Sequence, residues 1–338
     1  NNFFGVNLIM RVLITGVAGY LRNNTCLELI KRGHDIFVID NFSNSSNLAL
    51  EKVCDYTGVK FPYRNCDFRS KLCMKSRFCQ FQPDAVIHFA GLKSANESIK
   101  KPISYFNNNI GSTLSLLECM QENSIFKIIF SSSATVYNDK QSLPLKETAK
   151  IGNTQNPYGT TKYIIERILM DLVKSDNRWS IRIARYFNPI SNHSTGLIKE
   201  NPKDVPNNLV PYIIRVAQRK LPLLKVFGKN YKTKDGTGIR DYIHVMDLAD
   251  GHVAMIKNNR MKKGLKIYNF GTGKGSSVLE VIKSFENLTG ISIPFRFIKR
   301  RKGDVAASFC SPKKAIKELN WVANFNLKQA ISDIKKII

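Results

Sequence analysis

The sequence contains no long hydrophobic run, and nowhere do about 20 apolar residues follow one another, the length that a membrane-spanning helix needs. It also has no internal repeat and no low-complexity tract. With 43% hydrophobic and 10% aromatic side chains among 338 residues, the chain can bury a substantial core. These features exclude a disordered protein, a collagen-like repeat, a small disulfide scaffold and a membrane-spanning segment.

Cysteines arranged for a metal or for a disulfide framework are lacking too. The seven cysteines are irregularly spaced and do not form Cys-x-x-Cys pairs. His88 and His244 each lie in an apolar run, which favours a structural histidine over a metal ligand. We therefore expect no metal, and reduced thiols in a cytoplasmic protein. The cysteines are Cys26, Cys54, Cys66, Cys73, Cys79, Cys119 and Cys310.

Acidic residues are scarce, since 26 Asp and Glu face 52 Lys and Arg and leave a formal net charge of +26. A field of this sign attracts phosphate, so nucleic-acid binding is one interpretation. The basic residues, however, are spread along the whole chain, and the densest run is only Lys299–Lys302. We therefore expect a basic, solvated surface and no specific nucleic-acid partner.

The first half of the chain alternates short apolar runs with longer amphipathic segments. The apolar runs are rich in Val, Ile and Phe on both faces, the pattern of parallel strands buried between helices. This alternation predicts an α/β fold with a doubly wound parallel sheet of the Rossmann type. The predicted strands are Arg11–Thr15, Asp35–Asp40, Ala85–Ala90, Lys127–Ser131 and Ile181–Phe187, and the predicted helices are Tyr20–Lys31, Pro102–Glu122 and Tyr158–Lys174.

After Phe187, Gly, Pro and Asn become frequent and the apolar runs become short. We expect a Rossmann-type domain over residues 10–188 and a smaller, loop-rich domain over residues 189–338, with a cleft between them. Residues 241–262 are expected to pack back on the first domain. Residues 1–9 precede Met10, lack the basic start of a secretory signal, and are interpreted as an N-terminal extension.

A strand, a glycine turn and a helix follow one another around Gly16 and Gly19, as in a dinucleotide-binding loop. Such a loop lets the backbone approach a pyrophosphate, which faces the N–H groups of the helix start. Arg22 replaces the third glycine of the pattern, so either the helix shifts or Arg22 points outward, where it can meet the phosphate. A tight turn without a ligand is equally compatible with this segment alone.

Two carboxylates extend this prediction. Asp40 ends the second predicted strand, about 20 residues beyond the glycine turn, where a carboxylate accepts hydrogen bonds from the adenosine ribose and repels a 2′-phosphate. NAD is therefore favoured over NADP. Asp67 is placed to meet the adenine, although a turn-capping aspartate is an equally good interpretation of it.

A tyrosine and a lysine separated by three residues carry the strongest chemical signal. Tyr158 and Lys162 lie on one face of a predicted helix, and a nearby ammonium would lower the pKa of the phenol toward that of a useful general base. The same spacing also occurs in aromatic–lysine pairs without a function. Ser133, however, follows a strand at the carboxyl edge of the sheet, where its hydroxyl can bond a substrate oxygen. Together these residues predict hydride transfer at a secondary alcohol.

Longer motifs accompany these residues. They are His88-Phe-Ala-Gly-Leu-Lys93, Ser131-Ser-Ser-Ala-Thr-Val-Tyr137, Asn156-Pro-Tyr-Gly159, Arg185-Tyr-Phe-Asn-Pro189, Val205-Pro-Asn-Asn-Leu209, Gly236-Thr-Gly-Ile-Arg-Asp-Tyr-Ile-His-Val245 and Gly303-Asp-Val-Ala-Ala307. With them the chain resembles, from about Met10 almost to its C-terminus, the NAD-dependent sugar epimerases of the extended short-chain dehydrogenase/reductase family. The resemblance implies reversible C4 epimerisation of UDP-glucose and UDP-galactose through a 4-keto sugar, with tightly bound NAD, in galactose metabolism.

The resemblance also implies roles for single residues. Tyr158 is the base, Ser133 is its hydroxyl partner, and Lys162 tunes the phenol and holds the nicotinamide ribose. Cofactor contacts are implied for Gly16, Gly19, Tyr20, Leu21, Asp40, Asn41, Asp67, Phe68, Phe89, Ala90, Gly91, Lys93, Asn108, Tyr158, Lys162 and Phe187. UDP-sugar contacts are implied for Lys93, Ser133, Tyr158, Asn188, Asn208, Leu209, Val226, Phe227, Arg240, Arg301, Asp304 and Ser308.

The preferred sugar and the assembly are implied less directly. Ser308 stands where some relatives have a bulky tyrosine and others a small residue, so UDP-N-acetylglucosamine and UDP-N-acetylgalactosamine are candidate substrates. A homodimer joined through helices such as Pro102–Glu122 and Tyr158–Lys174 is implied. Two alternatives stay open: an inactive or weakly active NAD- or UDP-sugar-binding relic, motivated by Arg22, and another sugar-nucleotide enzyme of this family. A dehydratase would carry an Asp-Glu pair where this chain has Ala134-Thr135.

Overall fold

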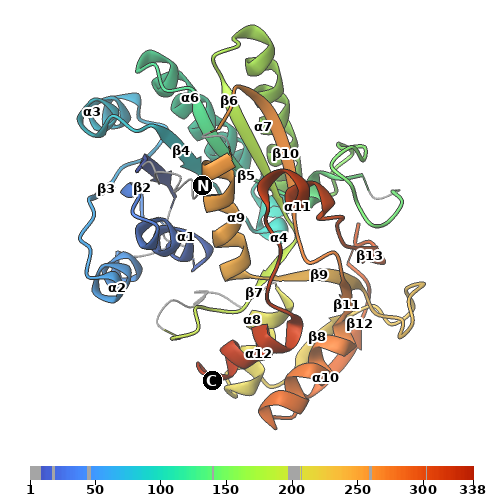
Figure 1. Cartoon of the computed structure of the whole chain (residues 1–338). Coiled ribbons are helices and arrows are strands. Elements are labelled where there is room, and N and C mark those ends of the chain that lie inside the picture. The colour runs from blue at the N-terminus through green and yellow to red at the C-terminus, as the bar shows by residue number, and fades with distance from the viewer. Residues whose placement is uncertain are drawn as a thin grey trace, which may run out of the picture.

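Seven parallel strands form the main sheet of the computed structural model, in the spatial order β10-β6-β5-β4-β1-β2-β3 (Figure 1). The structure describes residues 9–16, 20–43, 47–138, 141–196, 206, 208–258, 261–301 and 303–338, so the predicted extension over residues 1–9 lies outside it except for Ile9. The predicted α/β class with a doubly wound sheet is confirmed. The strands are β1 Arg11–Thr15, β2 Asp35–Asp40, β3 Tyr63–Asn65, β4 Ala85–His88, β5 Lys127–Ser133, β6 Ser180–Tyr186 and β10 Gly264–Phe270.

Helices cover both faces of this sheet, because its central strands are apolar on both sides. In β1, Val12 and Ile14 pack toward α1, α2 and α9, whereas Leu13 packs toward α3, α6 and α7. The helices are α1 Tyr20–Lys31, α2 Leu48–Thr57, α3 Lys71–Phe81, α4 Ala95–Lys100, α5 Pro102–Phe106, α6 Ser112–Glu122, α7 Pro157–Ser175 and α9 Val245–Lys257.

A smaller layer lies beyond the carboxyl ends of the strands (Figure 1). Its central strand β9 pairs with β11, β13 and β7, and β8 pairs with β12. Three amphipathic helices, α8, α10 and α12, enclose a second apolar core. The elements are β7 Asn188–Ile190, α8 Leu209–Ala217, β8 Leu224–Phe227, β9 Ile239–His244, β11 Gly275–Ser277, α10 Val278–Thr289, β12 Phe295–Ile298, β13 Ala307–Ser308, α11 Lys313–Leu319 and α12 Leu327–Lys335.

The chain returns from this layer to the main sheet. Helix α9 packs against α1, and β10 then pairs in parallel with β6 along its whole length. Helix α9 and β10 therefore lie on the main sheet, although they follow the first strands of the smaller layer.

The predicted elements agree with the observed ones except at their ends. The strand expected over Ala85–Ala90 ends at His88, because the Ala90 N–H bonds the side-chain hydroxyl of Thr15 (3.3 Å) instead of a backbone carbonyl of a neighbouring strand. The helix expected over Pro102–Glu122 contains a π-helical turn at Asn107–Gly111. Within the described part of the chain, no helix has the length and apolar character that crossing a membrane requires.

The prediction of reduced thiols was wrong for two cysteines. Cys66 and Cys73 form a disulfide with Cα atoms 6.1 Å apart, because the chain folds back between the end of β3 and the start of α3. Irregular cysteine spacing carries no signal for such a local pair. The free cysteines in the described residues are Cys26, Cys54, Cys119 and Cys310.

Candidate active site

The candidate site begins with the glycine turn that follows β1. Gly16 has a φ of +69°, and a Cβ there would lie 2.4 Å from the Cα of Ala90 in the loop after β4. Only glycine allows this approach. Gly19 lies outside the described residues, as does the side chain of Tyr20, while Leu21 is partly buried at the start of α1. The guanidinium of Arg22 donates a hydrogen bond to the Gly16 carbonyl, so this side chain turns inward, unlike the outward arginine that was one of the two alternatives.

The end of β2 presents a carboxylate next to this turn. Asp40 is buried, and its Oδ1 accepts a hydrogen bond from the Phe42 N–H at 2.6 Å. Asn41 Oδ1 accepts one from the Ser43 N–H at 3.2 Å. These bonds fix the direction of the loop that follows the strand.

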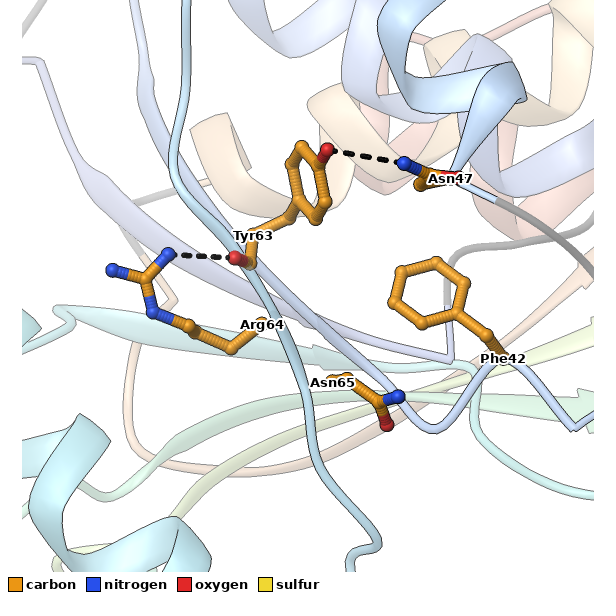
Figure 2. Close-up of a pocket in the computed structure, with 5 residues that line it drawn as sticks. All are labelled: Phe42, Asn47, Tyr63, Arg64 and Asn65. Carbon is orange, nitrogen blue, oxygen red and sulfur yellow. Dashed lines mark hydrogen bonds between the residues drawn. The ribbon is translucent and has the colours of Figure 1, made fainter.

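An open cavity of about 370 Å³, which the sequence did not predict, flanks the ends of β2 and β3. Figure 2 shows the ring of Phe42 beside that of Tyr63, whose hydroxyl accepts a hydrogen bond from the Asn47 amide at 3.4 Å. Arg64 and Asn65 complete the lining. Asn65 is the register partner of Asp40, so the cavity adjoins the end of β2.

Asp67 and Phe68 follow β3 at the same edge. The carboxylate of Asp67 pairs with Arg69 at 2.5 Å, and this hydrogen bond lowers the pKa of Asp67. Phe68 is buried with its ring edge toward His88. Asp67 therefore has a partner in its own turn, which agrees with the turn-capping interpretation that stood beside the adenine contact.

The loop after β4 carries several of the expected cofactor residues. Phe89 is buried, Ala90 and Gly91 are partly buried, and Lys93 is exposed. The backbone of this loop is held by Asn109, a residue that the sequence analysis missed. Asn109 Oδ1 accepts from the Leu92 N–H at 2.7 Å and its Nδ2 donates to the Leu92 carbonyl at 3.0 Å. The expected Asn108 is its partly buried neighbour in the π-helical turn.

The three expected catalytic side chains meet at the carboxyl edge of the sheet. Ser133 is the last residue of β5, and its hydroxyl forms a hydrogen bond with the phenol of Tyr158. Helix α7 begins where it does because the Asn156 side chain accepts a hydrogen bond from the Gly159 N–H (2.9 Å) and Pro157 suits the first turn. This cap places Tyr158 in the first turn of α7, and the buried Lys162 lies one turn further along the helix.

Burial dominates the proton affinity of this pair. It raises the pKa of Tyr158, whereas the Ser133 hydrogen bond and the charge of Arg22 lower it. The expected net lowering of the Tyr158 pKa by Lys162 was wrong, because burial outweighs the lowering effects. Lys162 Nζ donates to the Ser131 carbonyl at 2.7 Å. Burial and Arg22 lower the pKa of Lys162 to about 7, against the attraction of Glu166.

A buried ion pair lies behind the catalytic residues. Arg185 on β6 donates to both carboxylate oxygens of Glu166 on α7, at 3.0 and 2.6 Å. Glu166 also accepts a hydrogen bond of 2.5 Å from the Ser132 hydroxyl. Both charged side chains are essentially without solvent contact. The pair joins α7 to β5 and β6 and so fixes the helix that carries Tyr158.

A second charged cluster lies in the smaller layer. Arg240 on β9 forms an ion pair with Asp304, which also accepts a hydrogen bond from the Tyr231 hydroxyl at 3.3 Å. The guanidinium of Arg301 lies 3.8 Å from the ring centre of Phe227. The structure therefore brings together four residues expected to bind the UDP-sugar, and adds Tyr231, which the sequence analysis missed.

Known proteins are similar to this chain in sequence. The model of the NAD dependent epimerase/dehydratase family matches residues 12–271. The chain belongs to this family. It is 46% identical to a UDP-glucose 4-epimerase from Pasteurella multocida and 45% identical to one from Dictyostelium discoideum, over 96% of this chain and at least 95% of each relative.

Solved structures of family members share the fold. A UDP-glucose 4-epimerase from Bifidobacterium longum, in complex with NAD+ and UDP, has a TM-score of 0.93 and 46% identity, with 97% of both chains covered. One from Stenotrophomonas maltophila, with bound NAD and formylated UDP-arabinopyranose, has a TM-score of 0.93 and 41% identity, with the same coverage.

The donor set of this chain suits the cofactor of the family. A buried carboxylate ends β2, Gly16 has no side chain where the loops converge, and a lysine and a tyrosine face the edge of the sheet. A dinucleotide requires this combination of ribose acceptor, open backbone and cation. In the described residues, no group of three or more His, Cys, Asp or Glu side chains is arranged to hold a metal ion.

The two histidines singled out in the sequence are structural. His88 bonds the Thr15 hydroxyl at 2.7 Å and the Thr113 hydroxyl at 2.9 Å, and burial lowers its pKa to about 3. His244 Nδ1 accepts from the Met246 N–H at 3.0 Å and so caps α9. Their predicted structural role is confirmed.

The remaining expected substrate residues are dispersed around the smaller layer. Ser308 on β13 lies beside Arg240 in the sheet register. Val226 is buried in the second core, so its side chain stabilises the layer. Asn188 is partly buried at the start of β7 and follows Phe187, the buried residue expected to contact the cofactor. Asn208 and Leu209 begin α8.

Proposed function

We propose that this chain interconverts UDP-glucose and UDP-galactose by inverting C4 of the hexose, as a UDP-glucose 4-epimerase of galactose metabolism. The observation that carries this proposal is that the Ser133 hydroxyl bonds the phenol of Tyr158, while Lys162, one helical turn further along α7, donates to the Ser131 carbonyl. The relatives named UDP-glucose 4-epimerase match the chain along nearly its whole length. A likeness of this extent includes the substrate layer as well as the sheet.

The residues of this chain would handle the proton of the reaction. NAD, when bound, supplies the reversible oxidation and reduction of C4. Tyr158 Oη takes the proton of the C4 hydroxyl and later returns it, while the Ser133 hydroxyl bonds the C4 oxygen. Because burial raises the pKa of Tyr158, nearby positive charge is needed to hold the phenolate. Arg22 is the cation whose charge lowers this pKa, and Lys162 lies one helical turn from Tyr158 on α7.

The two parts of the chain would divide the ligands between them. In residues 10–188, Asp40 accepts hydrogen bonds from the adenosine ribose and excludes a 2′-phosphate, which supports NAD over NADP. In residues 189–338, Arg240 and Arg301 offer two permanent charges to the diphosphate of the UDP-sugar. Asp304 forms an ion pair with Arg240 and so holds that side chain in place.

Incubation of the purified chain with UDP-galactose, with and without added NAD, tests this function. Separation of the sugar nucleotides should show UDP-glucose formed until the two reach equilibrium. If the chain binds NAD but converts no UDP-galactose at any NAD concentration, it is the binding relic that the inward-turned Arg22 makes the second candidate. A dehydratase is disfavoured because Ala134 and Thr135, which follow Ser133, supply no acid–base pair.

Ser308 supports a wider sugar range. It is a small, partly buried side chain beside Arg240, so a 2-acetamido group has room there. Replacing Ser308 with Tyr is expected to reduce turnover of UDP-N-acetylgalactosamine at least about tenfold, since the ring would occupy that room. Turnover of UDP-galactose by the same variant is the control. Equal activity of both forms on the acetylated sugar would refute the idea.

A homodimer is the proposed assembly. Ile99, Ile103 and Leu114, on the consecutive helices α4, α5 and α6, are 61%, 83% and 42% exposed, and exposed apolar side chains near one another often mark an interface. Sedimentation should give twice the chain mass of 38.4 kDa, and Ile103→Lys should shift the protein toward monomer. A monomeric wild type would refute the assembly.

A cytoplasmic location is proposed as well. Cys26, Cys119 and Cys310 are buried free thiols and Cys54 is a partly buried one, which suits a reducing compartment. The disulfide between Cys66 and Cys73 argues against a reducing compartment. Fractionation of the source cells would decide the location.

A further inference from the structure

Arg22 stands where the dinucleotide-binding pattern has its third glycine, and its side chain turns back to the glycine turn after β1. Among the described residues, its only hydrogen bond is to the carbonyl of Gly16. The guanidinium carbon lies 6.0 Å from the ring centre of Phe89. The side chain thus connects the turn after β1 with the loop after β4, the two segments between which the cofactor of the family would lie.

The charges around Arg22 belong to the same cleft. Asp40, at the end of β2, attracts the guanidinium, and so do the phenols of Tyr158 and Tyr186. The positive charge in turn lowers the pKa of Lys162. Arg22 therefore contributes to the electrostatics of both the ribose end and the catalytic end of the site.

Most N–H donors of the Arg22 guanidinium have no hydrogen-bond partner among the described residues. A guanidinium has five N–H donors, and one carbonyl accepts from it in the described structure. Burial lowers the pKa of Arg22 despite the attraction of Asp40, so the surroundings as a whole disfavour its charge. A diphosphate brings negative charge and several acceptor oxygens, and arginine pairs with such oxygens in bidentate geometry.

We propose that Arg22 is a direct ligand of the diphosphate of NAD and compensates for the glycine that this chain lacks. The inference rests on the proposed function, because it takes NAD as the cofactor. It replaces the two sequence-based expectations, a shifted helix or an outward arginine, with an inward side chain that the cofactor engages. The opposite role, a side chain that obstructs the cleft, predicts the opposite effect of removing it.

The test is the affinity for NAD and for ADP, which also carries a diphosphate, measured by calorimetry at two salt concentrations. Arg22→Met removes the charge but keeps a good helix former in α1. We expect it to weaken the binding of both ligands about tenfold or more, and to make the affinity less dependent on salt. Arg22→Lys should recover part of the lost affinity, since it restores the charge without the planar guanidinium that binds in bidentate geometry.

Arg178→Met is the matched control, because Arg178 is exposed, pairs with Asp176, and lies after α7 away from the cleft. It changes the net charge equally and should leave both affinities unchanged. The unliganded Arg22→Met variant should melt no lower than wild type. Unchanged or tighter NAD binding by Arg22→Met would overturn the inference and leave the proposed function standing. A wild type that binds neither ligand would overturn both.

Discussion

Replacing Tyr158 with Phe is expected to lower kcat for UDP-galactose by about 10²- to 10⁴-fold, the usual contribution of a positioned general acid–base. The substitution removes only the oxygen that exchanges the proton and keeps the ring. Ser133 would lose the partner of its hydroxyl, but α7 and its Asn156 cap would not change. NAD affinity, measured by fluorescence titration, should therefore stay within a few-fold of the wild type.

Tyr163→Phe is the control for this prediction. Tyr163 is a partly buried tyrosine on the same helix, and its ring lies against Gly152, away from Ser133. Its loss of a hydroxyl should leave kcat nearly unchanged. A Tyr158→Phe variant that retains wild-type kcat would show that another group moves the proton, and the proposed mechanism would then be abandoned.

Replacing Arg185 with Met is expected to lower the free energy of unfolding by about 3–5 kcal/mol, because it leaves the carboxylate of Glu166 buried without its counter-charge. Arg185 supplies two of the hydrogen bonds to this carboxylate, and only the Ser132 hydroxyl remains among those described. Urea denaturation followed by circular dichroism measures the loss.

Two further variants make this prediction specific. Arg178→Met breaks an exposed pair with Asp176 and should cost less than about 1 kcal/mol. Adding Glu166→Leu to Arg185→Met removes the stranded charge and should recover much of the stability, as buried pairs replaced by apolar residues often do. If Arg185→Met costs no more than Arg178→Met, the buried pair does not stabilise α7 against the sheet.

Local patterns predicted the parts of the molecule that depend on near neighbours in sequence. Apolar runs predicted β1 and β2 to the residue, because burial on both faces demands such runs. Asn156 and Pro157 mark the start of α7, and the spacing of Tyr158 and Lys162 then follows from the helix period. Candidate catalytic residues could therefore be named from the sequence, and the family resemblance extended them to the UDP-sugar side.

Directions of side chains within the site were beyond these patterns. Nothing in the spacing indicates that Lys162 bonds the Ser131 carbonyl, or that Arg22 reaches the carbonyl of Gly16. Asn109 and Tyr231 were missed because their partners lie far away along the chain, in the loop after β4 and at Asp304. Each of these contacts depends on which atoms compete for a donor once the loops have converged.

By itself, the sequence of this protein determined the alternation of strands and helices, the glycine turn and the residue types that can move a proton, because these follow from local periodicity and from side-chain chemistry. Only the tertiary structure decided that β10 pairs with β6, that Cys66 meets Cys73, and that burial rather than Lys162 dominates the pKa of Tyr158. Pairings between distant segments are selected by the free energy of the whole packed chain, and the desolvation of a buried group depends on every segment that surrounds it.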